Sequence, residues 1–301
     1  MKKFILASVV SLASLCSVSA QQVKLSFNPE KGSKYEYHTE MVQNIKTMVM
    51  GQEILAEMAM GVTYLMEIID KEEDTTTMQF TYNGIAYAVS SSFMKMEYDS
   101  KKPNENPSDI DIMLSKMFSE MLGKSFVAVF AADGTTLSLT GMETIGENMT
   151  NAIAGDGQML AQLGAQMKQQ FSGDAVKNMF EQSFKFYPAN PVRTGNSWNT
   201  EIATTLNNFS VISKTKYTLK SVNRGVATIT FVTKMDMNPE TSLMEGEFVG
   251  TQTGTMGIDT KTGIPLTLNA SSKMNGVVKA SGVDVQMVFE STTKTTTKKI
   301  E

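Results

Sequence analysis

The chain has 301 residues, with 27 basic and 31 acidic side chains, a formal net charge of −4 and one cysteine. Charges of both signs are interspersed, which excludes the basic surface of a nucleic-acid-binding protein, and a single cysteine excludes an intramolecular disulfide or a thiolate metal cluster. Methionine is the unusual residue, because 24 copies are several times ordinary usage.

Residues 1–20 have the pattern of a secretory signal peptide. Two lysines are followed by the apolar run Phe4–Leu15 and by the small-residue cleavage site Val18-Ser19-Ala20. We therefore expect cleavage near Ala20 and a periplasmic or secreted protein of about 280 residues. A leucine precedes Cys16, where the lipoprotein peptidase needs a small residue, so a lipoprotein is not expected. No second apolar run of about 18 residues occurs, and we expect no transmembrane segment.

The expected mature chain, residues 21–301, is interpreted as one β-rich domain whose first β unit spans residues 21–102. A short strand is predicted at Val23–Phe27 and a long one at Lys34–Met50. From Ile54 to Ile68 every even position is apolar, which is typical of a strand with one dry face. A strand of this length must twist, and this favours a sheet that curves around other elements.

The rest of the first β unit is predicted from turn signals. Asn83-Gly84 is a strong signal for a two-residue hairpin and would join strands at Thr75–Tyr82 and Ile85–Ser90. A further strand is predicted at Met94–Tyr98. The polar, proline-bounded segment Lys101–Pro107 then leads out of the unit.

Helical periodicity dominates residues 103–186. Ser108 is suited to cap a helix that ends near Leu122, because apolar side chains recur there at spacings of three and four. A hairpin with an Asp133-Gly134 turn interrupts the block, and helical spacing resumes over Met142–Phe184. Each helical piece is amphipathic and needs an apolar surface to cover. We therefore expect the block to be an insertion that packs on the concave face of the sheet.

Residues 187–301 are predicted to repeat the first β unit. Three groups of segments match in the same order, with gaps of turn-like length. In chain order, Phe27-Asn28-Pro29 and Gly32–Tyr35 match Asn190-Pro191 and Gly195–Trp198. Next, Tyr64, Ile69-Asp70-Lys71 and Thr77–Phe80 match Tyr217, Val222-Asn223-Arg224 and Thr228–Phe231. Last, Met96–Lys101 matches Met256–Lys261.

In this second unit the short turn Thr262–Pro265 stands where the first unit carries the helical block. Two strands are predicted to follow, Leu266–Met274 and Val277–Thr297, with an Asn275-Gly276 turn between them. The terminal segment Ser291–Lys299 is almost entirely Ser, Thr and Lys, and is interpreted as a solvated strand or a frayed end.

These patterns together predict an α+β fold that is mainly β. Its centre is a long curved antiparallel sheet built from two repeated β units, with an inserted helical block packed on the concave face.

Two segments carry a resemblance to a known family. Asn190–Trp198 has a proline followed by a Gly-polar-Ser-Trp strand start, and Gly257–Pro265 has an Asp-x-x-x-Gly-Ile-Pro turn. In both, the chain resembles a family of uncharacterised secreted proteins from the Bacteroidota, a domain of unknown function. More loosely, a curved sheet that embraces helices is similar to the periplasmic lipoprotein-carrier architecture, which implies acyl chains held between sheet and helices.

Catalytic and metal-binding signals are weak. His38 is the only histidine, and Glu36 and Glu40 share its face of a predicted strand. Same-face neighbours on a strand lie about 6.6 Å apart, too far for three of them to bind one ion, so an exposed strand histidine is expected instead. No nucleophile elbow, phosphate loop or zinc motif occurs. We expect no enzyme and no cofactor.

The methionines allow two interpretations. Their flexible thioethers can fill irregular gaps in a core or line a surface that accepts varied apolar shapes. Candidate ligand-lining residues lie on the apolar face of the long second strand and on the apolar faces of the helices: Met58, Met60, Val62, Tyr64, Met66, Met113, Met117, Phe118, Met121, Met179 and Phe180.

No reaction or ligand is named by the sequence itself. Amphipathic helices, a curved sheet and abundant methionine favour a protein that binds or carries an apolar ligand such as a lipid or an acyl chain. The alternative is a structural or protein-interaction module of the cell envelope without a small-molecule ligand.

Overall fold

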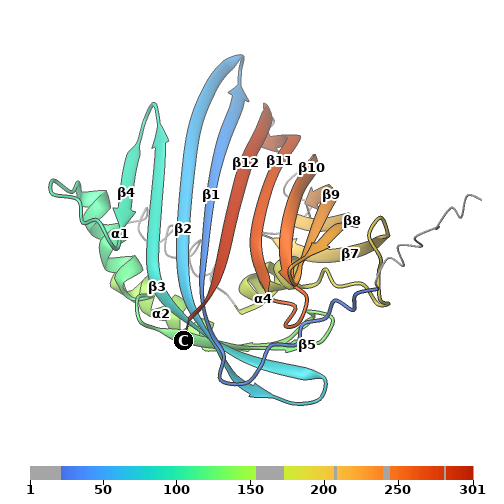
Figure 1. Ribbon diagram of the computed structural model, residues 1–301. Coiled ribbons are helices and arrows are strands. Elements are labelled where there is room, and N and C mark those ends of the chain that lie inside the picture. Colours follow the sequence, from blue (N-terminus) through green and yellow to red (C-terminus); the bar gives the residue numbers. More distant parts are fainter. Residues whose placement is uncertain (1–21, 154–172, 207–208, 240–244, 281–282, 301) are drawn as a thin grey trace, which may run out of the picture.

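The computed structural model describes residues 22–153, 173–206, 209–239, 245–280 and 283–300. Over these ranges the chain is mostly β, with one open antiparallel sheet of twelve strands and three helices (Figure 1). The expected signal peptide and the helical spacing of Leu160–Phe171 lie outside the described residues.

The strands are β1 (Lys34–Val49), β2 (Gln52–Lys71), β3 (Thr75–Ser91), β4 (Lys95–Asp99), β5 (Ser125–Ala131), β6 (Thr136–Thr140), β7 (Ser197–Leu206), β8 (Phe209–Asn223), β9 (Val226–Pro239), β10 (Glu245–Asp259), β11 (Pro265–Ala280) and β12 (Val283–Ile300). The helices are α1 (Asp109–Ser119), α2 (Met142–Ala152) and α4 (Gly173–Phe184).

The order of strands in the sheet is β6-β5-β3-β2-β1-β12-β11-β10-β9-β8-β7, and β4 pairs with β3. The first and the last strand of the chain therefore lie side by side in the middle of the sheet (Figure 1). The terminal segment Ser291–Lys299 belongs to β12, which pairs with β1 on one side and β11 on the other. It is a central strand and not a frayed end, and its Thr295 is buried with a hydroxyl contact of 3.0 Å to Thr39.

The long strands alternate between a dry and a wet face, as the even-position pattern of β2 predicts. Tyr64, Met66 and Ile68 are buried, whereas Glu53 and Glu57 are exposed on the other side. We call the face that carries the buried side chains the inner face, and its opposite the outer face. Figure 1 shows the sheet strongly curved, and the end that carries the β1–β2 turn, at the top of that view, is called the upper end.

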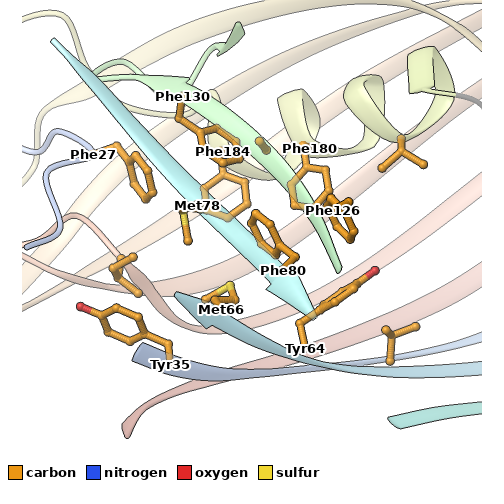
Figure 2. Packing of buried hydrophobic residues seen from close by; sticks show 14 of the residues in the cluster. Phe27, Tyr35, Tyr64, Met66, Met78, Phe80, Phe126, Phe130, Phe180 and Phe184 are labelled. Carbon is orange, nitrogen blue, oxygen red and sulfur yellow. The ribbon is translucent and has the colours of Figure 1, made fainter. Parts of the chain in front are cut away.

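An aromatic cluster forms the centre of the core at the lower end of the inner face (Figure 2). Phe80 of β3 stacks on Phe126 of β5 with ring centroids 5.1 Å apart, and Phe180 of α4 contacts Phe80 at 4.8 Å. Phe27, which precedes β1, meets Phe130 edge to face at 5.4 Å. Rings at these separations gain more than their buried area alone provides.

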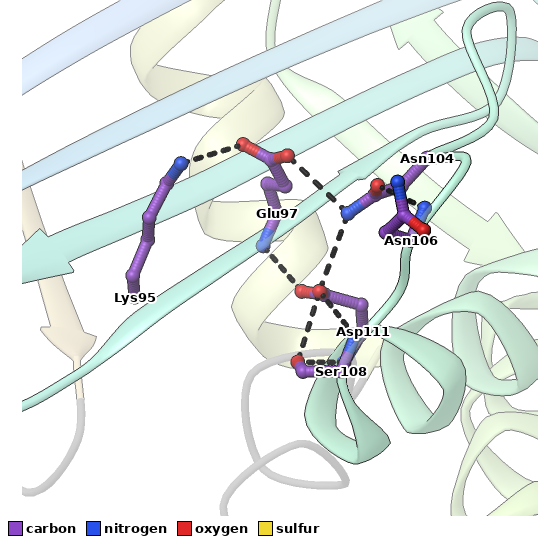
Figure 3. Close-up of polar contacts among 6 residues, drawn as sticks. All are labelled: Lys95, Glu97, Asn104, Asn106, Ser108 and Asp111. Carbon is purple, nitrogen blue, oxygen red and sulfur yellow. Dashed lines mark hydrogen bonds and ion pairs between the residues drawn. The ribbon is translucent and has the colours of Figure 1, made fainter.

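Helix α1 begins where the sequence predicts, at the Ser108 cap. The Ser108 hydroxyl accepts from the Asp111 backbone, and the Asp111 carboxylate accepts from the Ser108 backbone N–H at 2.9 Å. The same carboxylate accepts the Glu97 backbone N–H of β4 at 2.8 Å (Figure 3). One side chain therefore closes the capping box and ties the helix to the sheet.

The Asn83-Gly84 hairpin prediction is wrong. Both residues lie inside β3, and the register shift against Thr63 and Tyr64 of β2 marks a bulge there. A Cβ on Gly84 would lie 3.0 Å from Lys101 Cε and 3.4 Å from Thr63. Glycine is present because neighbouring groups approach it closely. A bulge favours glycine for this reason as readily as a turn does.

The Asn275-Gly276 turn prediction is wrong for a related reason. Strand β11 runs through both residues to Ala280. A Cβ on Gly276 would overlap the ring of Phe248 and the carbonyl oxygen of Glu247 on β10. The glycine leaves the space into which the phenylalanine ring fits.

Two further elements differ from expectation. The segment Val23–Phe27 forms only an isolated bridge, between Val23 and Val192, and not a strand. The hairpin inside the helical block, β5 and β6, pairs with β3 and extends the main sheet. Residues 103–186 therefore contribute strands to the sheet as well as helices.

Candidate functional site

The structure divides the candidate ligand-lining residues into two sets. Most of them lie in the hydrophobic cluster at the lower end of the inner face, either buried or packed against it: Val62, Tyr64, Met66, Met117, Phe118, Met121 and Phe180, with Met60 and Met113 partly buried at its border. Met58 is half-buried farther up β2. Met179 is 48% exposed and does not join the others.

Helix and strand methionines do occur in one cluster at the lower end. Met66, Met117 and Met121 are each 1% exposed. Side chains at that level of burial fill space in a packed interior. The open part of the inner face therefore begins above them, near Met58.

A row of half-buried apolar side chains crosses the inner face one same-face position above Met58, level with Ala56 of β2. Strand register places Ile45 of β1 opposite Phe289 of β12, Phe289 opposite Met274 of β11, and both Met274 and Met235 of β9 opposite Gly250 of β10. We call Ile45, Phe289, Met274 and Met235 the apolar row. All four are half-buried, and none belongs to the cluster at the lower end.

Glycines keep this region smooth. Phe248 of β10 is buried beside Gly276, and its ring lies 5.8 Å from that of Phe289. At Gly250 a Cβ would lie 3.1 Å from Met274 Cβ and 3.2 Å from Met235 Cε. The two methionines therefore occupy the space over Gly250, where even a Cβ would be crowded.

A polar row runs directly below the apolar row. Six adjacent strands, in the order β1, β12, β11, β10, β9 and β8, each contribute one residue to it, and each residue is the register partner of the next: Gln43, Ser291, Ser272, Gln252, Thr233 and Thr215. Their hydroxyls pair, Ser272 with Ser291 at 2.7 Å and Thr215 with Thr233 at 2.9 Å. This polar row separates the apolar row from the buried cluster.

The outer face has a different character. A shallow hollow of about 430 Å³ lies over β1, β12, β11 and β10, and hydroxyls such as those of Thr251, Thr253 and Thr292 contribute to its lining. Lys273 and Glu290 pair across it at 2.7 Å. None of the predicted methionines borders this hollow, which is polar where the inner face is apolar.

His38 is part of a side-chain network on the outer face. Its Nδ1 lies 2.9 Å from the Thr63 hydroxyl and its Nε2 lies 3.1 Å from Glu40. Within the part of the chain that the structure describes, no group of three His, Cys, Asp or Glu side chains could hold a metal ion.

Burial perturbs the tyrosines of the inner face. It raises the pKa of Tyr82 to about 12 and raises the pKa of Tyr64 and of Tyr187 well above the usual value. The Tyr187 hydroxyl donates to the Gly263 carbonyl at 2.7 Å, and the Tyr64 and Tyr82 rings lie 4.8 Å apart. These groups stay neutral at physiological pH and act as core side chains.

Sequence reasoning missed all four members of the apolar row; Met58, which it did single out, lies opposite Gln43 of the polar row. Each member stands in a strand whose alternation is visible, but alternation does not reveal which strands are neighbours. The row becomes visible only through the pairing of β1 with β12, whose partners are about 250 residues apart in the chain.

Comparison with solved structures gives remote likenesses. Lipovitellin, from a structure described as showing lipid–protein interactions, matches at 9% identity and a TM-score of 0.47 over 89% of this chain; the match spans only 25% of the lipovitellin chain. An outer membrane channel from Pseudomonas putida F1 matches at 9% identity and a TM-score of 0.26, over 90% of this chain and 98% of that one. The translocator domain of the autotransporter NalP from Neisseria meningitidis matches at 7% identity and a TM-score of 0.22, with 88% of each chain covered.

Because every one of these TM-scores lies below 0.5, none of the likenesses supports a shared function. Among the described residues, no helix is both long and apolar enough to cross a bilayer. None of the curated proteins matches the sequence. One family does match, over residues 73–265 and thus over more than half of the chain, and the protein belongs to this family of unknown function, DUF6263.

Proposed function

We propose that this protein binds an apolar ligand, such as the acyl chain of a lipid, on the upper inner face of its sheet. The observation that carries the proposal is the apolar row, which continues the inner face beyond the packed cluster while its side chains stay half-buried. Contiguous apolar surface that the core does not consume is typical of ligand-binding grooves.

The dimensions and chemistry of this face suit a flexible chain. From Ile45 to Met235 the row crosses four strand spacings of about 4.8 Å, roughly 19 Å in all. Thioethers can adjust to chains of varied length and unsaturation. The polar row beneath offers hydroxyl and amide groups to the polar end of an amphiphile. This proposal assigns a binding role and no catalytic one.

Two further expectations complete the proposal. We propose that the chain is exported and cleaved near Ala20, which would place it among envelope lipids. We also propose that the helical block as a whole covers the inner face, and the ring contacts of Phe118 and Phe180 with the sheet support this. In addition, we propose that the two β units derive from one ancestral unit.

The experiment is a pair of neighbouring substitutions on β11. Met274→Asp places a charge in the apolar row. Asn275→Asp, the control, introduces the same residue one position away on the outer face, so that the low strand propensity of aspartate affects both variants. We expect Met274→Asp to weaken binding of a fluorescent fatty-acid analogue at least about tenfold, and Asn275→Asp to leave it unchanged. Met274→Ala, which removes contacts without adding charge, should give an intermediate loss.

Native mass spectrometry of the protein purified from its own host provides the complementary readout. A bound lipid that disappears in Met274→Asp supports the proposal. Absence of bound lipid, together with equal probe binding by both Asp variants, would contradict it and favour the structural or protein-interaction module.

A further inference from the structure

Two hairpin turns at the upper end of the sheet expose large apolar side chains. Met50, in the β1–β2 turn, and Phe93, between β3 and β4, are each 81% exposed, and Met94 is 41% exposed. Solvent exposure of a phenylalanine and a methionine gives the folded chain no burial free energy. We call Met48–Met50 and Phe93–Met94 the hairpin tips.

Local structure does not require methionine at the first tip. Met50 and Gly51 have φ values of 50° and 79°, so both central residues of the turn are left-handed. That conformation favours Gly, Asn or Asp, whereas a methionine there is disfavoured by its Cβ. The side chain at position 50 is therefore explained neither by the backbone of the turn nor by packing.

Both tips are free of formal charge and are bordered by ion pairs. On the first hairpin the pair is Lys46 with Glu53, and between these two residues and the turn no charged side chain occurs. Three strand residues separate Lys46 from the turn, and one, Gln52, separates Glu53 from it. The uncharged tip is therefore about 3–10 Å deep, which overlaps the depth of about 5–10 Å to which interfacial segments enter a bilayer. On the second hairpin, Lys95 pairs with Glu97 at 3.6 Å just beyond the tip.

The two tips belong to neighbouring hairpins. Strand β2 pairs with β3 up to the partners Ala56 and Ser91, so both turns leave the sheet at the same end (Figure 1). Leu55, just before that last pair, is 57% exposed. A single flat surface can therefore contact both tips at once.

The shape and charge of the tips favour a lipid bilayer over a protein partner. A stable protein interface buries about 1,200–2,000 Å² of complementary surface, whereas two separate turns present only small protrusions. A bilayer interface deforms around such protrusions and gains from aromatic and thioether side chains. The Lys–Glu pairs are neutral as units, so attraction to anionic lipid is not needed.

We propose that the hairpin tips insert into the interfacial layer of a lipid bilayer and dock the upper end of the sheet on a membrane. The inference is independent of the ligand proposed above, because the tips lie beyond the apolar row. If both hold, the docked protein presents the apolar row next to the lipid phase.

The test is flotation of the full mature chain with phosphatidylcholine vesicles. The tip variant combines Met50→Asn with Phe93→Ser. Its matched control combines Ile69→Asn with Ile112→Ser and also removes two exposed apolar side chains, one at the lower end of β2 and one on α1. We expect the tip variant to bind vesicles at least about tenfold more weakly than the parent chain, and the control to bind like the parent. Addition of phosphatidylglycerol should change parent binding little.

Folding is monitored in the same variants. Asparagine suits the left-handed turn position, so Met50→Asn should keep or raise the melting temperature and a misfolded protein cannot mimic the result. The tip variant should also keep full binding of a fatty-acid analogue. The proposal is overturned if the parent chain and the tip variant float equally, or if vesicle binding appears only with phosphatidylglycerol. It is also overturned if the tip variant no longer binds the fatty-acid analogue, or if the substitutions abolish self-association and not vesicle binding.

Discussion

The division of the inner face into a packed cluster and a more open part above it can be tested with two methionine-to-alanine substitutions. Met117 of α1 is 1% exposed within the cluster, whereas Met58 of β2 is half-buried above it. Each substitution removes the same three heavy atoms. Any difference between the two must come from what surrounds them.

The magnitudes follow from burial. Loss of a fully buried methionine side chain costs roughly 2–3 kcal/mol in transfer free energy, and the cavity raises the total to about 2–5 kcal/mol. For a chain of this size, 3 kcal/mol corresponds to a fall in melting temperature of roughly 6–12 °C. At Met58 part of that burial is absent from the start, so the loss should stay near or below about 1 kcal/mol.

Denaturant unfolding and titration with an apolar dye measure the two outcomes in parallel. We expect Met117→Ala to lower stability without changing dye binding by the folded fraction, and Met58→Ala to change dye binding with little loss of stability. Equal losses of stability at both positions, with dye binding unaffected, would refute the division of the face.

Three other predictions concern stability. Burial raises the folded pKa of Tyr187 and brings that of Tyr82 to about 12. The contribution of these two neutral side chains to the free energy of unfolding is therefore complete below the unfolded pKa near 10 and is lost as pH rises toward and past 12. Alkaline unfolding, followed by tyrosinate absorbance, should show a smaller loss of stability with pH in Tyr187→Phe. Asp111→Ala should lower the free energy of unfolding by about 1–3 kcal/mol, whereas Asp109→Ala, at an exposed position, should lower it by less than about 1 kcal/mol. Backbone donors lower the pKa of Asp111, so the stability that its carboxylate contributes is present above the unfolded pKa and is lost as pH falls. Measuring stability during an acid titration should detect this loss. Gly276→Ala should lower stability by about 1–3 kcal/mol, as thermal unfolding would show, because its Cβ overlaps a ring and a carbonyl oxygen.

Local signals predicted much of the fold because they act over a few residues. The Ser108 cap and the apolar stripe after it identify α1 to within a few residues. The alternation of β2 identifies both its course and its dry face. In each case the pattern and the structure depend on the same short-range geometry.

Long-range pairing could not be predicted in this way. The Ser/Thr/Lys pattern of Ser291–Lys299 allows a solvated strand or a frayed end, and the segment is a strand at the centre of the sheet with one exposed face and with Thr295 and Thr297 buried on the other. The buried Thr295 hydroxyl finds a partner in the Thr39 hydroxyl of β1. The partner that makes a polar strand acceptable lies about 250 residues away, beyond the reach of any local rule.

The two Asn-Gly pairs show why turn signals are ambiguous. Glycine is needed both for positive φ in a turn and for close approach of a neighbouring group. At Gly84 and Gly276 the second need applies, and only the approaching groups, Thr63 and Phe248, reveal it. For the candidate site the same limit holds, since the methionines that crowd Gly250 come from adjacent strands.

The polar row gives a physical reason why one sheet can carry both a packed core and a half-buried apolar row. Hydroxyls paired across β11 and β12 and across β8 and β9 fix the register of the strands without adding apolar surface. Below them the buried cluster supplies most of the hydrophobic free energy, so the lower half of each strand is held firmly. Above them the hairpins are held mainly by ladder hydrogen bonds and half-buried side chains, which open at lower cost than the core. Entry of the proposed ligand at the upper end would therefore leave the packed cluster intact.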